Sequence, residues 1–149
     1  MSVAIQNILV PLDMSATSDR VAGYATEMSR CFGAKLTALL VVEEGETLRG
    51  LNMPTISYDD ILPDLEVQAR KKLETYAHTR LRGAKGLDLR VSHGEAWEKI
   101  LEAARETSAD LIVMGTHGRR GLERAIFGST AERVLRRSPV PVVAVPLEA

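Results

Sequence analysis

Apolar residues along the chain gather in short continuous runs that turn-forming residues bound. Four runs have the length of strands buried on both faces, and a weaker alternating stretch supplies a fifth. They are Asn7 to Pro11, Lys35 to Val42, Leu87 to Val91 (the alternating stretch), Asp110 to Gly115 and Val140 to Val145. Continuous apolar runs of this kind are typical of parallel sheets, because such sheets are covered on both sides.

Longer amphipathic segments separate these runs and have the period of helices. They cover Ser15 to Cys31, Asp59 to Arg82, Glu95 to Thr107 and Ser129 to Arg137. In the first of them Val21, Ala22, Ala25, Met28 and Phe32 share one face. Strands that alternate with helices predict an α/β fold: a three-layer, doubly wound, five-stranded parallel sheet with right-handed crossovers and helices on both faces.

Two prolines and one long connection add detail on the ends of the strands and on the loops. Proline has no N–H to donate, so Pro11 predicts the end of the first strand and Pro141 places the last strand at an edge of the sheet. The connection from Glu43 to Tyr58 contains two glycines and a proline and shows no period. It is either a mobile lid or a divergent surface loop, and we favour the loop.

Composition limits the functional classes. The 149 residues, 45% hydrophobic and 26% charged, predict one globular domain over residues 1–149. Nineteen Lys and Arg against twenty Asp and Glu leave no strongly basic footprint, so we expect no nucleic-acid partner. No apolar run is long enough for membrane insertion. We expect a cytoplasmic protein, and a buried, inert position for the lone cysteine, Cys31.

Candidate chemistry lies in the loops after the first and fourth strands, because ligands of open parallel sheets bind beyond the carboxyl ends of the strands. These loops are 11–15 and 115–121, and the glycines of the second let a ligand approach main-chain N–H groups. Gly128-Ser129-Thr130 opens a helix whose first N–H groups form an anion site. Spacing alone leaves phosphate binding and ordinary helix capping equally open.

No motif for catalysis stands in the chain. There is no G-x-x-x-x-G-K-[ST], G-x-S-x-G, H-E-x-x-H or G-x-G-x-x-G pattern. We therefore expect no enzymatic activity, no catalytic residue and no metal-ligating residue.

The glycines carry a resemblance. Gly115-Thr116-His117-Gly118, nine residues, then Gly128-Ser129 is similar to the signature of the nucleotide-binding branch of the universal stress protein family. The similarity extends over essentially the whole chain. It includes the segment Val10 to Ser15 at the start and the segment Ser138 to Val142 near the end. Leu40 stands where the family often has a histidine, so no role for that side chain carries over.

This resemblance implies strand order 3-2-1-4-5 in an adenine nucleotide alpha hydrolase-like, Rossmann-like fold. It also implies an ATP site, with ADP and AMP as alternatives and Mg²⁺ accompanying the triphosphate. By position, Pro11, Asp13 and Val41 flank adenine and ribose; Met114, Gly115, Gly118, Gly128, Ser129 and Thr130 hold ribose and phosphates; His117 and Arg119 reach the phosphate tail. Asp13 either binds the ligand or caps the first helix, and we favour the ligand.

The resemblance further implies a homodimer that pairs through the last strand, Val140 to Val145. Three functions follow, in order of preference. The first is a dimeric, nucleotide-responsive regulator of the stress response. The second is a slow ATPase or autophosphorylating protein with Ser129 and Thr130 as acceptors, and the third is a ligand-free dimeric adaptor.

Overall fold

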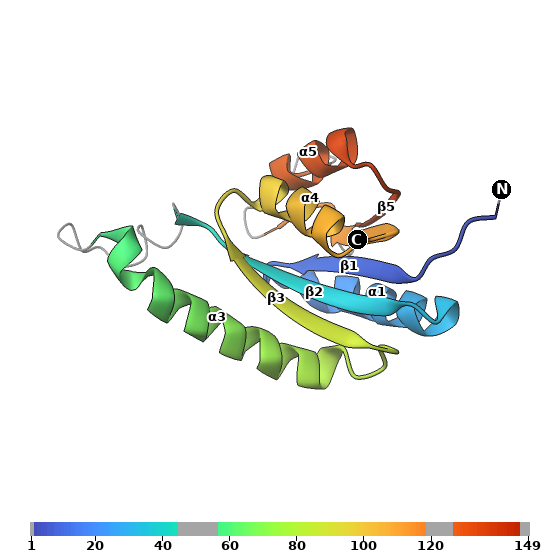
Figure 1. The fold of residues 1–149 in the computed structure, drawn as a ribbon, viewed down its shortest axis with the longest axis horizontal. Helices are drawn as coiled ribbons and strands as arrows, with labels where there is room; N and C mark the ends of the chain where they lie inside the picture. Colours follow the sequence, from blue (N-terminus) through green and yellow to red (C-terminus); the bar gives the residue numbers. More distant parts are fainter. Residues whose placement is uncertain (1, 45–56, 119–126, 147–149) are drawn as a thin grey trace.

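The computed structural model describes residues 2–44, 57–118 and 127–146. Strands and helices alternate along the chain (Figure 1). The elements are β1 (Asn7–Leu12), α1 (Ser18–Phe32), β2 (Lys35–Val42), α3 (Tyr58–Arg80), β3 (Leu87–His93), α4 (Ala96–Glu106), β4 (Leu111–Gly115), α5 (Ser129–Arg137) and β5 (Val142–Val145).

The strands form one parallel sheet in the order β3-β2-β1-β4-β5, as the resemblance implied. β1 lies at the centre and pairs with β2 over its whole length, from Asn7 opposite Lys35 to Leu12 opposite Leu40. The chain adds β2 and β3 on one side of β1 and β4 and β5 on the other. The direction reverses between β1 and β4, which places a crevice at their carboxyl ends.

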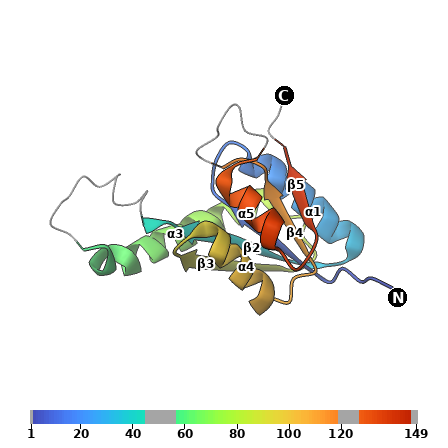
Figure 2. The same cartoon turned by 90° about the horizontal axis from the view of Figure 1, so that it is seen from above.

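Helices cover both faces of the sheet (Figure 2). Alternate strand residues pack beneath each layer. On one face Ile8, Val10 and Leu36 pack with α1 and α3. On the other face Leu9 and Ile112 pack with α4 and α5. This confirms the predicted three-layer α/β fold, and it follows from the period of two along each buried strand.

The ends of several elements differ from the prediction. β1 continues one residue past Pro11 to Leu12, while its pairing with β4 covers only Ile8 and Leu9. Pro11 therefore stays paired in register with β2 and stands beyond the last residue paired to β4, where no N–H is needed. Pro141 precedes β5, and β5 is an edge strand as predicted. Helix α1 begins at Ser18 rather than Ser15, because a turn occupies the residues after Asp13.

The predicted burial of Cys31 is wrong, and Phe32, predicted on the apolar face of this helix, is largely exposed. Cys31 is exposed, and its Sγ lies 3.5 Å from Glu27 Oε1. Phe32 is 52% exposed. The inward face of the last turn belongs to Ser29, whose hydroxyl is fully buried against the carbonyl of Ala34, and Cys31 lies two positions further round the helix.

The long connection predicted as a lid or loop falls mostly on residues 45–56, outside the described residues. Within the described ranges, no helix is both long enough and apolar enough to cross a membrane.

Candidate functional site

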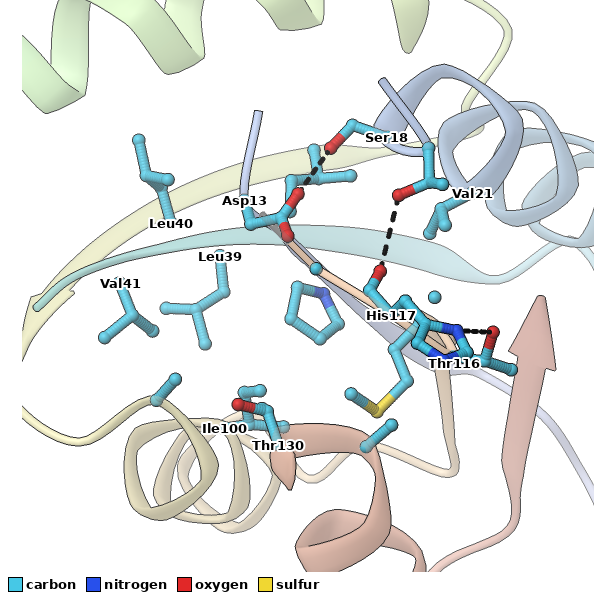
Figure 3. A pocket seen from close by; sticks show the side chains of 18 of the residues that line it. Asp13, Ser18, Val21, Leu39, Leu40, Val41, Ile100, Thr116, His117 and Thr130 are labelled. Atoms are coloured by element: carbon cyan, nitrogen blue, oxygen red, sulfur yellow. Dashed lines mark hydrogen bonds between the residues drawn. The ribbon is translucent and has the colours of Figure 1, made fainter. Parts of the chain in front are cut away.

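A cavity of about 190 Å³ opens at the carboxyl ends of β1, β2 and β4 (Figure 3). Residues from both predicted loops and from the first turns of α4 and α5 line it. They are Pro11, Leu12, Asp13, Thr17, Ser18, Val21, Leu39, Leu40, Val41, Glu43, Ala96, Ile100, Met114, Gly115, Thr116, His117, Gly118, Ser129, Thr130 and Ala131. The glycine loops thus lie on one cavity rather than on opposite edges of the sheet.

One part of this cavity is apolar. Leu39 and Val41 of β2, Ile100 of α4 and Met114 of β4 line it together with the ring of Pro11. These side chains belong to the α4 and α5 side of the sheet, where Leu39 and Met114 are part of the core. A flat apolar group such as a heterocyclic base would bury its faces here, because nonpolar walls with a few polar groups are typical of small-molecule sites.

Asp13 begins the loop after β1 and is held by its own chain. Its Oδ1 accepts from the Ser15 amide at 2.9 Å and from the Ser18 hydroxyl at 3.1 Å. Between Asp13 and Ser15, Met14 adopts a left-handed φ of 60°. This short turn fixes the Asp13 carboxylate at the cavity wall.

Gly118 lies directly against this carboxylate. A Cβ built on Gly118 would stand 2.5 Å from Asp13 Oδ2, so any side chain there would require the Asp13 carboxylate to shift. Neither Gly115 nor Gly118 has a positive φ. The need for glycine at Gly118 is therefore one of space, which keeps a main-chain surface open to the cavity.

The two halves of the glycine signature are joined by a hydrogen bond. The Gly128 amide donates to the Thr116 carbonyl at 2.6 Å, and the Thr116 amide donates to the Val145 carbonyl at 3.0 Å. Thr116 and His117 are buried, and Thr116 Oγ1 lies 3.0 Å from His117 Nδ1. Thr17 Oγ1 donates to the His117 carbonyl at 3.4 Å, which ties the β1 loop to the β4 loop.

The amino end of helix α5 lies where the Gly128 amide bonds to the Thr116 carbonyl. Gly128 is the N-cap, and among the described residues no side chain caps the helix. Ser129, Thr130 and Ala131, its first turn, line the cavity. The first N–H groups of a helix lack partners within it and carry the positive end of the helix dipole, so this turn suits an anion.

The start of α4 also lines the cavity, and there an amide already has a carboxylate as its hydrogen-bond partner. The Ala96 amide at the start of α4 donates to Glu43 Oε1 at 3.3 Å. Glu43 follows β2 and is partly buried. A carboxylate of the protein itself therefore already stands at the amino end of α4.

All predicted site residues except Gly128 and Arg119 line the cavity. Gly128 supports it through Thr116, and Arg119 lies outside the described residues. Prediction from sequence missed several lining residues, chiefly Thr17, Leu39, Glu43, Ala96 and Ile100. Only Glu43 carried a usable signal, an acidic residue directly after a buried strand; the others reach the cavity through tertiary packing.

No group of three or more His, Cys, Asp or Glu that could hold a metal ion occurs in the part of the chain that the structure describes.

Known proteins resemble this chain over nearly its full length. The sequence model of the universal stress protein family matches residues 4–146, and the chain belongs to this family. A relative from Methanocaldococcus jannaschii, universal stress protein MJ0531, is 32% identical over 144 residues, which are 94% of this chain and 81% of the relative.

Solved structures share the fold. Hypothetical protein MJ0577 aligns with a TM-score of 0.82 at 23% identity over 99% of both chains. A universal stress protein in complex with cAMP aligns with a TM-score of 0.63 at 24% identity, over 97% of this chain and 98% of the other. The universal stress protein from Archaeoglobus fulgidus in complex with dAMP gives a TM-score of 0.66 at 19% identity, over 96% and 99%.

Proposed function

We propose that the cavity binds an adenine nucleotide, ATP in the first place with ADP and AMP as alternatives, and that the chain acts as a dimeric, nucleotide-responsive stress protein. One observation carries the proposal: the bond from the Gly128 amide to the Thr116 carbonyl gathers both glycine segments and the amino end of α5 at one cavity. The complexes of two proteins of similar fold with cAMP and dAMP support an adenine nucleotide as the ligand.

The residues divide the ligand between them. The apolar walls around Leu39, Val41 and Met114 take the base. The Asp13 carboxylate accepts from a ribose hydroxyl. The uncapped first turn of α5 and the open backbone at Gly118 take the phosphates, because N–H donors and a helix dipole favour negative charge.

Mg²⁺ is expected to enter with a triphosphate, because phosphate oxygens are ligands that this ion prefers.

We propose binding without turnover as the function. Regulation of a partner by nucleotide needs only that two states of the protein differ in affinity for the ligand. If ATP incubated with purified protein is recovered intact after many hours, this part of the proposal holds; hydrolysis above background that survives repurification contradicts it.

Calorimetric titration with ATP tests the binding itself, with the Gly118→Ala variant as the probe. The added methyl group displaces the Asp13 carboxylate and covers the open backbone, so ATP affinity is expected to fall about tenfold or more, the loss of one charge-assisted hydrogen bond. Gly23→Ala in α1 is the matched control, since a Cβ there meets nothing within 4 Å. Absence of ATP binding by the wild-type protein at millimolar concentration contradicts the proposal.

A further inference from the structure

Glu43 is the carboxylate of the cavity that the proposed function does not use. It lines the cavity from the end of β2, where it follows Val41 and Val42, and it is partly buried, whereas the next residue, Glu44, is exposed and does not line the cavity. Its Oε1 accepts from the Ala96 amide at 3.3 Å, which holds the side chain against the start of α4.

The order of the strands decides which end of a nucleotide meets Glu43. β1 lies between β2 and β4, and neighbouring strands are about 4.8 Å apart, so the ends of β2 and β4 are separated by about 10 Å. Gly118 and the α5 start belong to the β4 end, and Glu43 belongs to the β2 end. A nucleotide with its phosphates at α5 therefore extends its base toward Glu43.

Charge favours the same orientation. Both α4 and α5 direct their amino ends at the cavity, and each would attract a phosphate if it stood alone. The α4 end already holds the Glu43 carboxylate, so a phosphate placed there would meet a like charge. The α5 end has no side-chain cap among the described residues.

We propose that Glu43 is a specificity-determining residue that accepts a hydrogen bond from the amine at position six of the base and rejects a base with an oxygen there. An ionised carboxylate only accepts hydrogen bonds. It therefore pairs with the amine at position six of adenine and repels the oxygen at that position of hypoxanthine or guanine, whose N1–H donor lies one ring position away. This inference rests on the proposed nucleotide site.

Asp13 is the alternative carboxylate, and its contacts place it elsewhere. Its Oδ1 already accepts from Ser15 and Ser18, and its Oδ2 faces Gly118 on the β4 side. That position suits a ribose hydroxyl rather than the outer edge of the base.

The test compares ATP with inosine triphosphate, which carries an oxygen in place of the amine at position six. Calorimetry on the wild-type protein is expected to give a preference for ATP of about tenfold or more, because inosine triphosphate presents an acceptor oxygen where adenine presents its amine, and its N1–H donor lies one ring position away. In Glu43→Gln this preference should fall to within about threefold, because an amide both donates and accepts.

Glu44→Gln is the control, since it removes the same charge from an exposed neighbour that does not line the cavity. In Glu43→Gln the amide oxygen of the new side chain can still accept from Ala96, so the start of α4 is kept. A merely structural role for Glu43 would weaken both ligands alike and leave their ratio unchanged.

Each outcome is decisive. An unchanged ratio in Glu43→Gln, or a ratio that falls in Asp13→Asn instead, overturns the inference while the proposed function stands. Equal binding of both nucleotides by the wild-type protein also overturns it. Failure of the wild-type protein to bind either nucleotide contradicts the proposed function itself.

Discussion

Single residues at the cavity serve two purposes, and Asp13 illustrates this. Its Oδ1 closes the turn that precedes α1, and its Oδ2 faces Gly118. The sequence left ligand binding and capping of the first helix open for Asp13. In the structure Thr17 is the N-cap of α1, and the turn that satisfies Asp13 Oδ1 leaves Oδ2 facing Gly118 in the β4 loop. The position of the Asp13 carboxylate therefore depends on the local backbone geometry around Met14.

Tyr76 gives a prediction of pH dependence. Burial, and then the hydrogen bond to Asp19 Oδ1 at 2.8 Å, raise the pKa of this phenol well above its usual range. The folded protein thus keeps the proton more firmly than the unfolded chain, so the stabilisation is complete below about pH 10 and is lost as the pH rises further. Denaturant unfolding between about pH 9 and pH 11 should show a falling free energy of unfolding.

In Tyr76→Phe this alkaline slope should become shallower, and the free energy of unfolding at neutral pH should fall by about 1 kcal/mol with the lost hydrogen bond. Tyr24→Phe is the control, because Tyr24 is 47% exposed. An identical alkaline slope in wild type and Tyr76→Phe would show that other groups cause it.

At the scale of the element, the amino end of α5 offers a test that separates stability from binding. Gly128→Asp places a carboxylate at the N-cap, where a Cβ finds ordinary contacts of 3.4 Å and longer. Capping and the helix dipole should stabilise the fold by about 0.3–1 kcal/mol. The same carboxylate occupies the N–H groups proposed for phosphate, so ATP affinity should fall about tenfold or more.

Thermal unfolding and calorimetry on one preparation measure both effects. Gly128→Ala, which adds the carbon without the charge, should lower the melting temperature slightly and retain most of the affinity. If Gly128→Asp binds ATP as tightly as the wild type, the phosphates do not lie at α5.

Helix α3 depends on one large side chain. Its buried residues are Ala69, Leu73 and Ala77, and Leu73 is fully buried against the sheet. Leu73→Ala should therefore lower the free energy of unfolding by about 2–5 kcal/mol. Val67→Ala, at a position 55% exposed, should change it by less than about 0.5 kcal/mol. Urea unfolding followed by circular dichroism compares the two, and equal losses would contradict this account of the packing.

The elements also show how far sequence patterns reach. Apolar runs, one of them alternating, predicted each strand of the sheet, because burial leaves a signal within the run itself. The ends were less accurate: hydrogen bonding of Asp13 delays α1 to Ser18, and the inward position of Ser29 turns Cys31 outward. Thr17 and Ile100 reached the cavity unpredicted, since nothing in their own segments indicates what the fold brings opposite them.

At the scale of the whole molecule, the sheet leaves β5 with one unpaired edge in the described structure. The Ile112 amide donates to the Pro141 carbonyl and the Thr116 amide to the Val145 carbonyl, so odd-numbered residues of this segment face β4. Val142 and Ala144 consequently direct their N–H and C=O groups outward. These outward groups would form the hydrogen bonds of the proposed homodimer. The edge strand also contacts the cavity, because Val145 accepts from Thr116, which lines it.

Ala144→Pro tests that dimer without disturbing the fold. Proline at this position removes an outward N–H and leaves the bonds to β4 intact, which an edge strand tolerates. Light scattering after size-exclusion chromatography should give twice the chain mass for the wild type and for the control Ala144→Ser, and the mass of one chain for Ala144→Pro. A proline variant that is folded and still dimeric would show that the interface lies elsewhere.

The edge strand also connects the proposed dimer to the nucleotide site. The Thr116 amide donates to Val145, and the Gly128 amide donates to Thr116, so loss of the dimer should also weaken ATP binding if nucleotide and partner chain are coupled through β5.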